Sequence, residues 1–152
     1  MSRNLNVGSA WLSVLGIFFV FGGIVEAFSL VPSEFSEEEL LGVTLSQIRD
    51  FSPKLVDSME LAVQTRGLYM LLFGLFWSVI SLVPYRNGEK WAWYALLVIG
   101  GIFVAGWLIV SYTGVTTGLL PSSSIPVTII LLILWMVGLA LPAREILGKP
   151  SS

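Results

Sequence analysis

Two charged side chains, Glu26 and Arg66, interrupt long apolar segments of this chain. Ionised side chains inside a membrane segment are costly, and they usually pair with one another or take part in function. Glu26 lies near the C-terminal end of the apolar stretch 11–31. Arg66 lies where the long segment 53–83 becomes apolar, so the two side chains are expected at a similar depth in the membrane. We therefore expect a Glu26–Arg66 ion pair that joins the first two helices.

Five further side chains belong to the predicted site or its surroundings. Glu60 is a competing partner for Arg66, but its place six residues earlier on the same helix puts the two on different faces. The aromatic side chains that would line an apolar pocket beside the pair are Tyr69, Trp77, Trp107 and Trp135, and the alternative is that they pack within the bundle or face lipid. The mid-helix positions of Trp77 and Trp135 favour the bundle interior. We consider three roles for this site: a structural ion pair, a polar anchor for a lipid headgroup or other amphipathic molecule, and part of a proton path. A proton path needs several ionisable groups at membrane depth, and the apolar segments offer one or two.

Composition argues against most familiar catalytic chemistry. The chain contains no cysteine and no histidine. Disulfides, thiolate nucleophiles, zinc and iron–sulfur ligation and Ser-His-Asp catalysis are therefore excluded. The sequence also has no glycine-rich phosphate loop and no basic patch for nucleic acid. We expect no catalytic residue, metal, cofactor or nucleic-acid partner, and we interpret Ser122-Ser123-Ser124 as a helix-capping loop.

Four apolar stretches must position these side chains. The chain of 152 residues is 55% apolar and 12% charged, whereas soluble domains are about 25% charged, so lipid contact is indicated. A helix of about 20 residues crosses a hydrocarbon core of about 30 Å, and backbone exposed to lipid must satisfy its own hydrogen bonds. The sequence thus predicts an all-α integral membrane four-helix bundle, a single transmembrane domain over 1–152. Its predicted helices are 11–31, 53–83, 91–112 and 125–141.

A secretory signal peptide is the alternative for the first stretch. Arg3 precedes it, and the small residues around Glu26 offer a cleavage site. The apolar run is about twice the length of the usual signal-peptide core. We therefore expect it to be retained as a membrane helix.

The polar stretch of about 33–57 is expected to cap the bundle. Ser36-Glu37-Glu38-Glu39 and Thr44-Leu45-Ser46-Gln47 both have the spacing of a capping box. They predict two short amphipathic helices on the membrane surface, and a solvated acidic loop is the alternative. Ser52-Pro53 then starts a helix longer than the membrane requires, with serine capping and proline in the first turn.

Small residues near the ion pair predict close helix packing. Gly22 and Gly23 lie beside Glu26 on the first helix. Small residues at helical spacing on the second helix are Gly67, Gly74, Ser78 and Ser81. Such faces let membrane helices approach each other closely.

Basic residues predict the topology. Those on the side of the two termini are Arg3, Arg86, Lys90, Arg144 and Lys149. On the opposite side Arg49, Lys54 and Arg66 stand among many acidic residues. By the positive-inside rule we expect a multi-pass protein of the cell membrane with both termini in the cytoplasm and the capping stretch outside.

The second predicted helix and the turn after it contain two sequence segments that resemble those of other membrane proteins. Thr65-Arg66-Gly67-Leu68 opens the apolar part of that helix, and Pro84-Tyr85-Arg86-Asn87-Gly88-Glu89-Lys90-Trp91-Ala92-Trp93-Tyr94 follows it. These segments resemble small four-helix membrane proteins of prokaryotes with an Arg-Gly helix start and a Pro-Tyr-Arg-x-Gly-Glu-x-Trp-Ala-Trp-Tyr turn. The resemblance implies the same topology and a prokaryotic origin, and it assigns no site or activity.

These features leave three hypotheses for function. The first is a structural or accessory membrane protein, a small subunit that contacts lipids and other membrane subunits or a second copy of itself. The second is a four-helix binder of a lipid-like or other apolar molecule near Glu26 and Arg66. The third is a transporter component, which would need to oligomerise to form a path. An enzyme is the least expected outcome.

Overall fold

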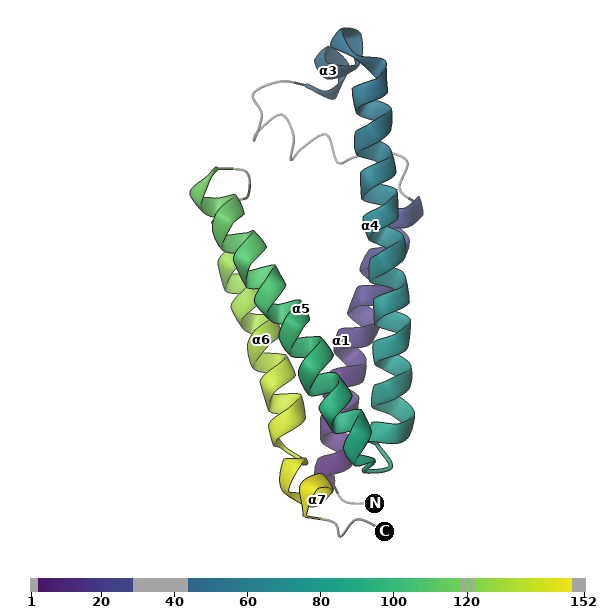
Figure 1. Ribbon diagram of the computed structural model, residues 1–152, viewed down its shortest axis with the longest axis vertical. Coiled ribbons are helices and arrows are strands. Elements are labelled where there is room, and N and C mark those ends of the chain that lie inside the picture. Colours follow the sequence, from purple (N-terminus) through teal and green to yellow (C-terminus); the bar gives the residue numbers. More distant parts are fainter. Residues whose placement is uncertain (1–2, 29–43, 119, 121, 149–152) are drawn as a thin grey trace.

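The computed structural model describes residues 3–28, 44–118, 120 and 122–148, and the secondary structure in these ranges is entirely helical (Figure 1). The long helices are α1 (Arg3–Phe28), α4 (Pro53–Ile80), α5 (Lys90–Thr116) and α6 (Ser124–Ala140), and the short ones are α3 (Leu45–Phe51) and α7 (Ala143–Leu147). Four segments are long and apolar enough to cross a membrane: α1, α4 with the turn after it, α5, and α6 with α7. The expected four-helix, all-α architecture is confirmed.

Several helix bounds differ from the sequence-based ones. α1 begins at Arg3 instead of residue 11, because its polar first turns make contacts at that end of the bundle. There the Asn4 Nδ2 donates to a carboxylate oxygen of Glu145 at 2.8 Å, and Asn6 accepts a bond from Arg86 at 3.3 Å. α5 likewise continues past residue 112 to Thr116.

The end of α4 is a π-helical turn, Ser81–Tyr85. Proline has no N–H and its ring crowds the carbonyl four residues earlier, so Pro84 interrupts the α-helical ladder at Ile80. The chain then reverses through Asn87-Gly88, where Gly88 has a φ of 75°. Glycine adopts this left-handed conformation without steric cost, which accounts for the turn predicted here.

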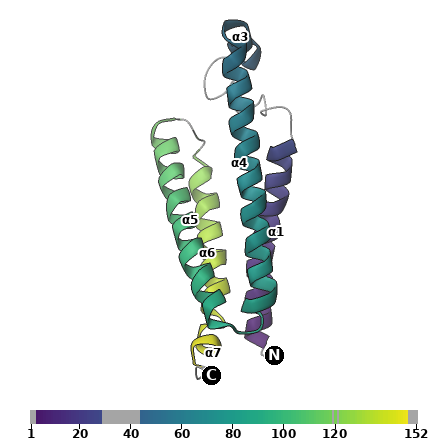
Figure 2. The ribbon, with the colours of Figure 1, turned by 45° about the vertical axis from the view of Figure 1, so that its right-hand side comes forward.

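The four long helices form two pairs. α1 packs against α4, and α5 packs against α6, as Figures 1 and 2 show from two directions. The pairs meet at the end that carries both termini, which we call the closed end, and they separate toward the other end, the open end. α4 extends beyond the other helices at the open end and carries α3 at its tip.

Glycines bring α1 and α4 into backbone contact. A Cβ on Gly67 would overlap the backbone of Ala27, and a Cβ on Gly23 would overlap the backbone of Leu71. A Cβ on Gly74 would lie 2.6 Å from the backbone nitrogen of Val20. The small-residue faces predicted from the sequence therefore do form the α1–α4 contact.

Hydrogen bonds from side chains to backbone carbonyls connect neighbouring helices toward the closed end. The indole N–H groups of Trp77, Trp93 and Trp135 each donate to a backbone carbonyl of another helix, at 2.9, 3.0 and 3.1 Å. The Ser9 hydroxyl donates to the Ser81 carbonyl at 2.6 Å. Trp77 and Trp135 are buried, as their mid-helix positions indicated. These bonds join the two helices within each pair, whereas the shared hydrophobic core and the packing of α1 against α6 hold the two pairs together at this end.

The cap is described in part. Thr44 and Gln47 form the expected capping box: the Thr44 hydroxyl accepts from the Gln47 backbone N–H at 3.2 Å, and the Gln47 side chain accepts from the Thr44 N–H at 2.9 Å. Ser52 occupies the N-cap position of α4 with Pro53 after it, but its side chain makes no capping bond. The other predicted short helix, at 36–39, lies outside the described residues.

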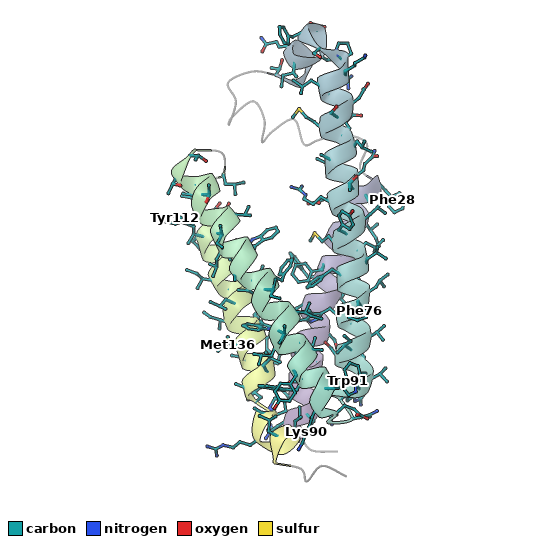
Figure 3. The ribbon with its side chains drawn as sticks, viewed as in Figure 1. Phe28, Phe76, Lys90, Trp91, Tyr112 and Met136 are labelled. Atoms are coloured by element: carbon teal, nitrogen blue, oxygen red, sulfur yellow. The ribbon has the colours of Figure 1, made fainter. Side chains whose placement is uncertain are left out.

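Large apolar side chains cover the outer surface of the bundle. Phe28, Phe76 and Met136 point away from it in Figure 3 and are 71%, 59% and 52% exposed. Contiguous apolar surface of this extent marks contact with lipid or with other proteins.

Candidate functional site

The separation of the two helix pairs leaves an apolar cleft between them. It contains two neighbouring cavities, of about 750 Å³ and about 300 Å³. Both cavities are bordered by Glu26, Arg66, Phe103 and Trp107. Binding sites for small molecules typically have volumes of about 300–1,000 Å³ and mostly apolar walls with a few polar groups.

Glu26 and Arg66 form the predicted ion pair. The Arg66 Nε donates to Glu26 Oε2 at 2.8 Å, and Nη2 donates to Oε1 at 3.0 Å. This bidentate geometry is the strong, directional arrangement of a guanidinium and a carboxylate. The Glu26 side chain is 28% exposed and the Arg66 side chain 64%, so the guanidinium remains accessible from the cleft.

The close contact of α1 and α4 positions the pair. Gly67 follows Arg66, and the missing Cβ of Gly67 is what lets the backbone of Glu26 and Ala27 approach α4. The two charged side chains therefore start from backbones already in contact. They extend from this crossing toward the cleft, where they line both cavities.

The larger cavity lies between the ion pair and the α5–α6 pair. Its remaining lining comes from α5, from α6 and from the connection between them: Ile102, Gly106, Val110, Ser111, Leu120, Ser123, Ser124 and Val127. Ser111 is buried and shares a 3.0 Å hydrogen bond with Thr128, which joins α5 to α6 behind this wall. The wall is thus apolar, with serine hydroxyls at its open end.

The smaller cavity lies between α4 and α5. Besides the four shared residues it is lined by Tyr69, Met70 and Phe73 of α4. Tyr69 is 70% exposed and also borders a shallow outer groove of about 550 Å³ on α4.

An aromatic cluster forms the floor of the cleft. Phe19, Phe73 and Phe103, from three different helices, have ring centroids 4.7–5.4 Å apart. The Trp107 ring stacks on Phe103 at 5.8 Å, one turn closer to the open end. This cluster separates the cavities from the packed closed end, because the gap that the described residues leave directly below it has a volume of about 20 Å³.

The structure brings together only part of the predicted site. Glu26, Arg66 and Tyr69 border the cleft, as does Trp107. Glu60 instead pairs with Arg49 of α3 at 3.2 Å and borders neither cavity. Trp77 and Trp135 lie below the floor, where each donates its N–H to a helix carbonyl.

Sequence reasoning missed Phe103, which borders both cavities. It lies one helical turn before Trp107, and Gly106 lies on the same cavity wall. That spacing was a usable signal, but α5 is apolar on all sides, so the sequence did not distinguish this face from the faces that point outward.

The arrangement combines a polar border with apolar walls. A neutral pair of opposite charges lies at the edge of two apolar cavities, and the larger one is also lined by Ser111, Ser123 and Ser124. Within the ranges given above, no three acidic side chains gather in a way that could hold a metal ion. Comparison of the chain with protein-family models, with curated proteins and with solved structures found no match.

Proposed function

We propose that this protein is a multi-pass membrane protein that binds a lipid-like amphipathic molecule in the cleft beside Glu26 and Arg66. The observation that supports the proposal is that two apolar cavities share Glu26 and Arg66 as their polar border. An amphipathic molecule has the matching division into an apolar body and a polar end. Its polar end would contact the ion pair, and its apolar part would contact Phe103, Trp107 and the α5–α6 wall.

The proposed orientation puts the closed end in the cytoplasm. Arg3, Arg86, Lys90 and Arg144 lie at this end, and cytoplasmic segments of membrane proteins are enriched in such residues. The cleft then opens in the outer half of the membrane. Because the chain has no native cysteine, single cysteines report the orientation cleanly. An impermeant thiol reagent added to whole cells should label Asp57→Cys and not Glu89→Cys, and the reverse pattern would contradict the orientation.

A variant that fills the larger cavity tests ligand binding. Gly106 lines this cavity, and a Cβ there would have no other described atom within 4 Å. Gly106→Leu should therefore occupy the cleft without disturbing helix packing. We expect the wild-type protein, extracted from membranes in mild detergent, to retain a bound amphipathic molecule in native mass spectrometry. The Gly106→Leu protein should retain much less of it.

Ala105→Leu is the matched control. Ala105 is the neighbouring residue on α5, is exposed and borders neither cavity. It should leave ligand retention unchanged, and circular dichroism should show the same helicity for all three proteins. Equal retention by wild type and Gly106→Leu, or no retention by either, would contradict binding in the cleft.

A second candidate is an accessory subunit of a larger membrane complex. The observation that favours it is the tip formed by α3 and the start of α4, which projects beyond the other helices and carries Phe51, 88% exposed. Aromatic side chains, phenylalanine among them, are enriched in protein interfaces. A photo-crosslinking amino acid at Phe51 should then capture a single stoichiometric membrane protein, whereas the same probe at Phe76 should capture mainly lipid. Equal crosslinking at the two positions would count against the accessory role.

A further inference from the structure

We propose that the molecule bound in the cleft is a phospholipid with two acyl chains and a zwitterionic headgroup that carries a phosphate and a primary ammonium. This inference rests on the proposed binding function and adds the class of ligand. Two independent features carry it, the branching of the cleft and the charge at the branch point.

The branching indicates two apolar chains. The cavities of about 750 Å³ and about 300 Å³ share the border of Glu26, Arg66, Phe103 and Trp107, and otherwise have different linings. One continues between the ion pair and the α5–α6 pair, and the other continues along Tyr69, Met70 and Phe73 of α4. A molecule with a single chain would fill one branch. A molecule with two chains joined at one polar head fills both, with the head at the ion pair.

The charge indicates a zwitterionic head. A guanidinium has five N–H donors, and Glu26 accepts from two of the nitrogens, so further N–H groups of Arg66 can donate to a phosphate. Each Glu26 oxygen accepts one bond from Arg66 and, among the residues that the structure describes, has a further lone pair for an ammonium donor. A headgroup with only a negative charge would be repelled by Glu26, and one with only a positive charge would be repelled by Arg66. A headgroup with both charges complements the pair without separating it.

The position of the pair fits this ligand. Glu26 lies in the last turn of α1, and Trp107 borders the cleft next to it. Tryptophan side chains concentrate where the hydrocarbon meets the headgroups of a bilayer. In the orientation proposed above, the pair lies at the headgroup level of the outer leaflet, with the aromatic floor deeper in the hydrocarbon.

A lipid competition experiment tests the inference. The protein is reconstituted into vesicles with equal amounts of phosphatidylethanolamine, phosphatidylglycerol and the single-chain lysophosphatidylethanolamine. It is then extracted in mild detergent, and its retained lipid is identified by native mass spectrometry. We expect phosphatidylethanolamine to exceed phosphatidylglycerol about tenfold, the ratio that one lost hydrogen bond to a charged group produces. Phosphatidylethanolamine should also exceed the single-chain lipid, which has the same headgroup but leaves one branch of the cleft without an acyl chain.

Variants of Glu26 separate charge recognition from folding. Glu26→Gln leaves the Arg66 charge without its counter-charge, so the preference should reverse toward the anionic phosphatidylglycerol. Glu26→Asp keeps the charge and should keep the preference for phosphatidylethanolamine. Glu60→Gln is the matched control, because Glu60 pairs with Arg49 away from both cavities and should not alter the lipid profile.

The outcomes distinguish this inference from the binding function itself. If the wild type retains at least as much phosphatidylglycerol as phosphatidylethanolamine, the proposed preference for a zwitterionic headgroup is wrong. If the single-chain lipid is retained as well as phosphatidylethanolamine, the proposal that two acyl chains fill the two cavities is wrong. In both cases, loss of retention in Gly106→Leu would still support binding in the cleft. Absence of every retained lipid from both wild type and Gly106→Leu would instead overturn the proposed function.

Discussion

The Tyr85 hydroxyl donates a 2.6 Å hydrogen bond to the backbone carbonyl of Gly138, and both groups are buried. The residue four positions after Gly138 is Pro142, which has no N–H to offer this carbonyl. Tyr85 therefore supplies the donor that α6 lacks where it ends. The same bond links the turn after α4 to α6, so it joins the two helix pairs at the closed end.

Replacing Tyr85 should loosen this joint. Tyr85→Phe keeps the ring but leaves the Gly138 carbonyl without its donor, which should lower the free energy of unfolding by about 1 kcal/mol. Unfolding by sodium dodecyl sulfate in mixed micelles measures the change. Tyr94→Phe is the control, because Tyr94 is 52% exposed, and it should leave stability unchanged. Equal effects of the two substitutions would show that the buried bond has no special role.

Glycine at the α1–α4 crossing should be more important for stability than glycine in the cleft. Gly67→Ala places a methyl group against the Ala27 backbone and should destabilise the protein by about 1–3 kcal/mol, as overpacking does. Gly106→Ala meets no described atom within 4 Å and should stabilise α5 by up to about 1 kcal/mol through helix propensity. Thermal unfolding in detergent compares the two. A neutral Gly67→Ala would mean that the helices are not in backbone contact there.

The Glu26–Arg66 pair should contribute little to stability. In the proposed orientation the pair lies at the hydrated headgroup level, and the Arg66 side chain is 64% exposed. A double-mutant cycle of Glu26→Gln and Arg66→Gln should therefore give a coupling energy below about 1 kcal/mol. The same cycle on Arg49 and Glu60 supplies a reference pair outside the cleft. A coupling energy of several kcal/mol, well above the reference, would instead support the structural role considered for this pair.

The capping box should stabilise α3 locally. Thr44→Ala removes the hydroxyl that accepts from the Gln47 N–H and should lower the stability of α3 by about 1 kcal/mol. Hydrogen exchange should then become faster in 45–51 and remain unchanged in α5. Ser58→Ala, which removes only a bond to the Lys54 carbonyl of the same helix, should not affect exchange in α3.

The sequence predicted those parts of the molecule that depend on local chemistry. Apolar runs had to be helices if they cross a membrane, since lipid offers no partner to backbone polar groups. Thr44 and Gln47 had the spacing of a capping box, and proline and glycine marked the turn after α4. The Glu26–Arg66 pair could also be predicted, because two isolated charges at similar depths on adjacent helices have few other partners.

Only the tertiary structure decided how these helices meet. The long helices are mostly apolar on every face, so the periodicity of their apolar residues does not indicate which face is buried. The pairing of α1 with α4, the bonds that fasten the closed end and the separation of the pairs at the open end arise from contacts between residues far apart in the chain. For that reason the sequence located the two charges, whereas the branched cleft and the wall of Phe103 and Trp107 required the packed bundle.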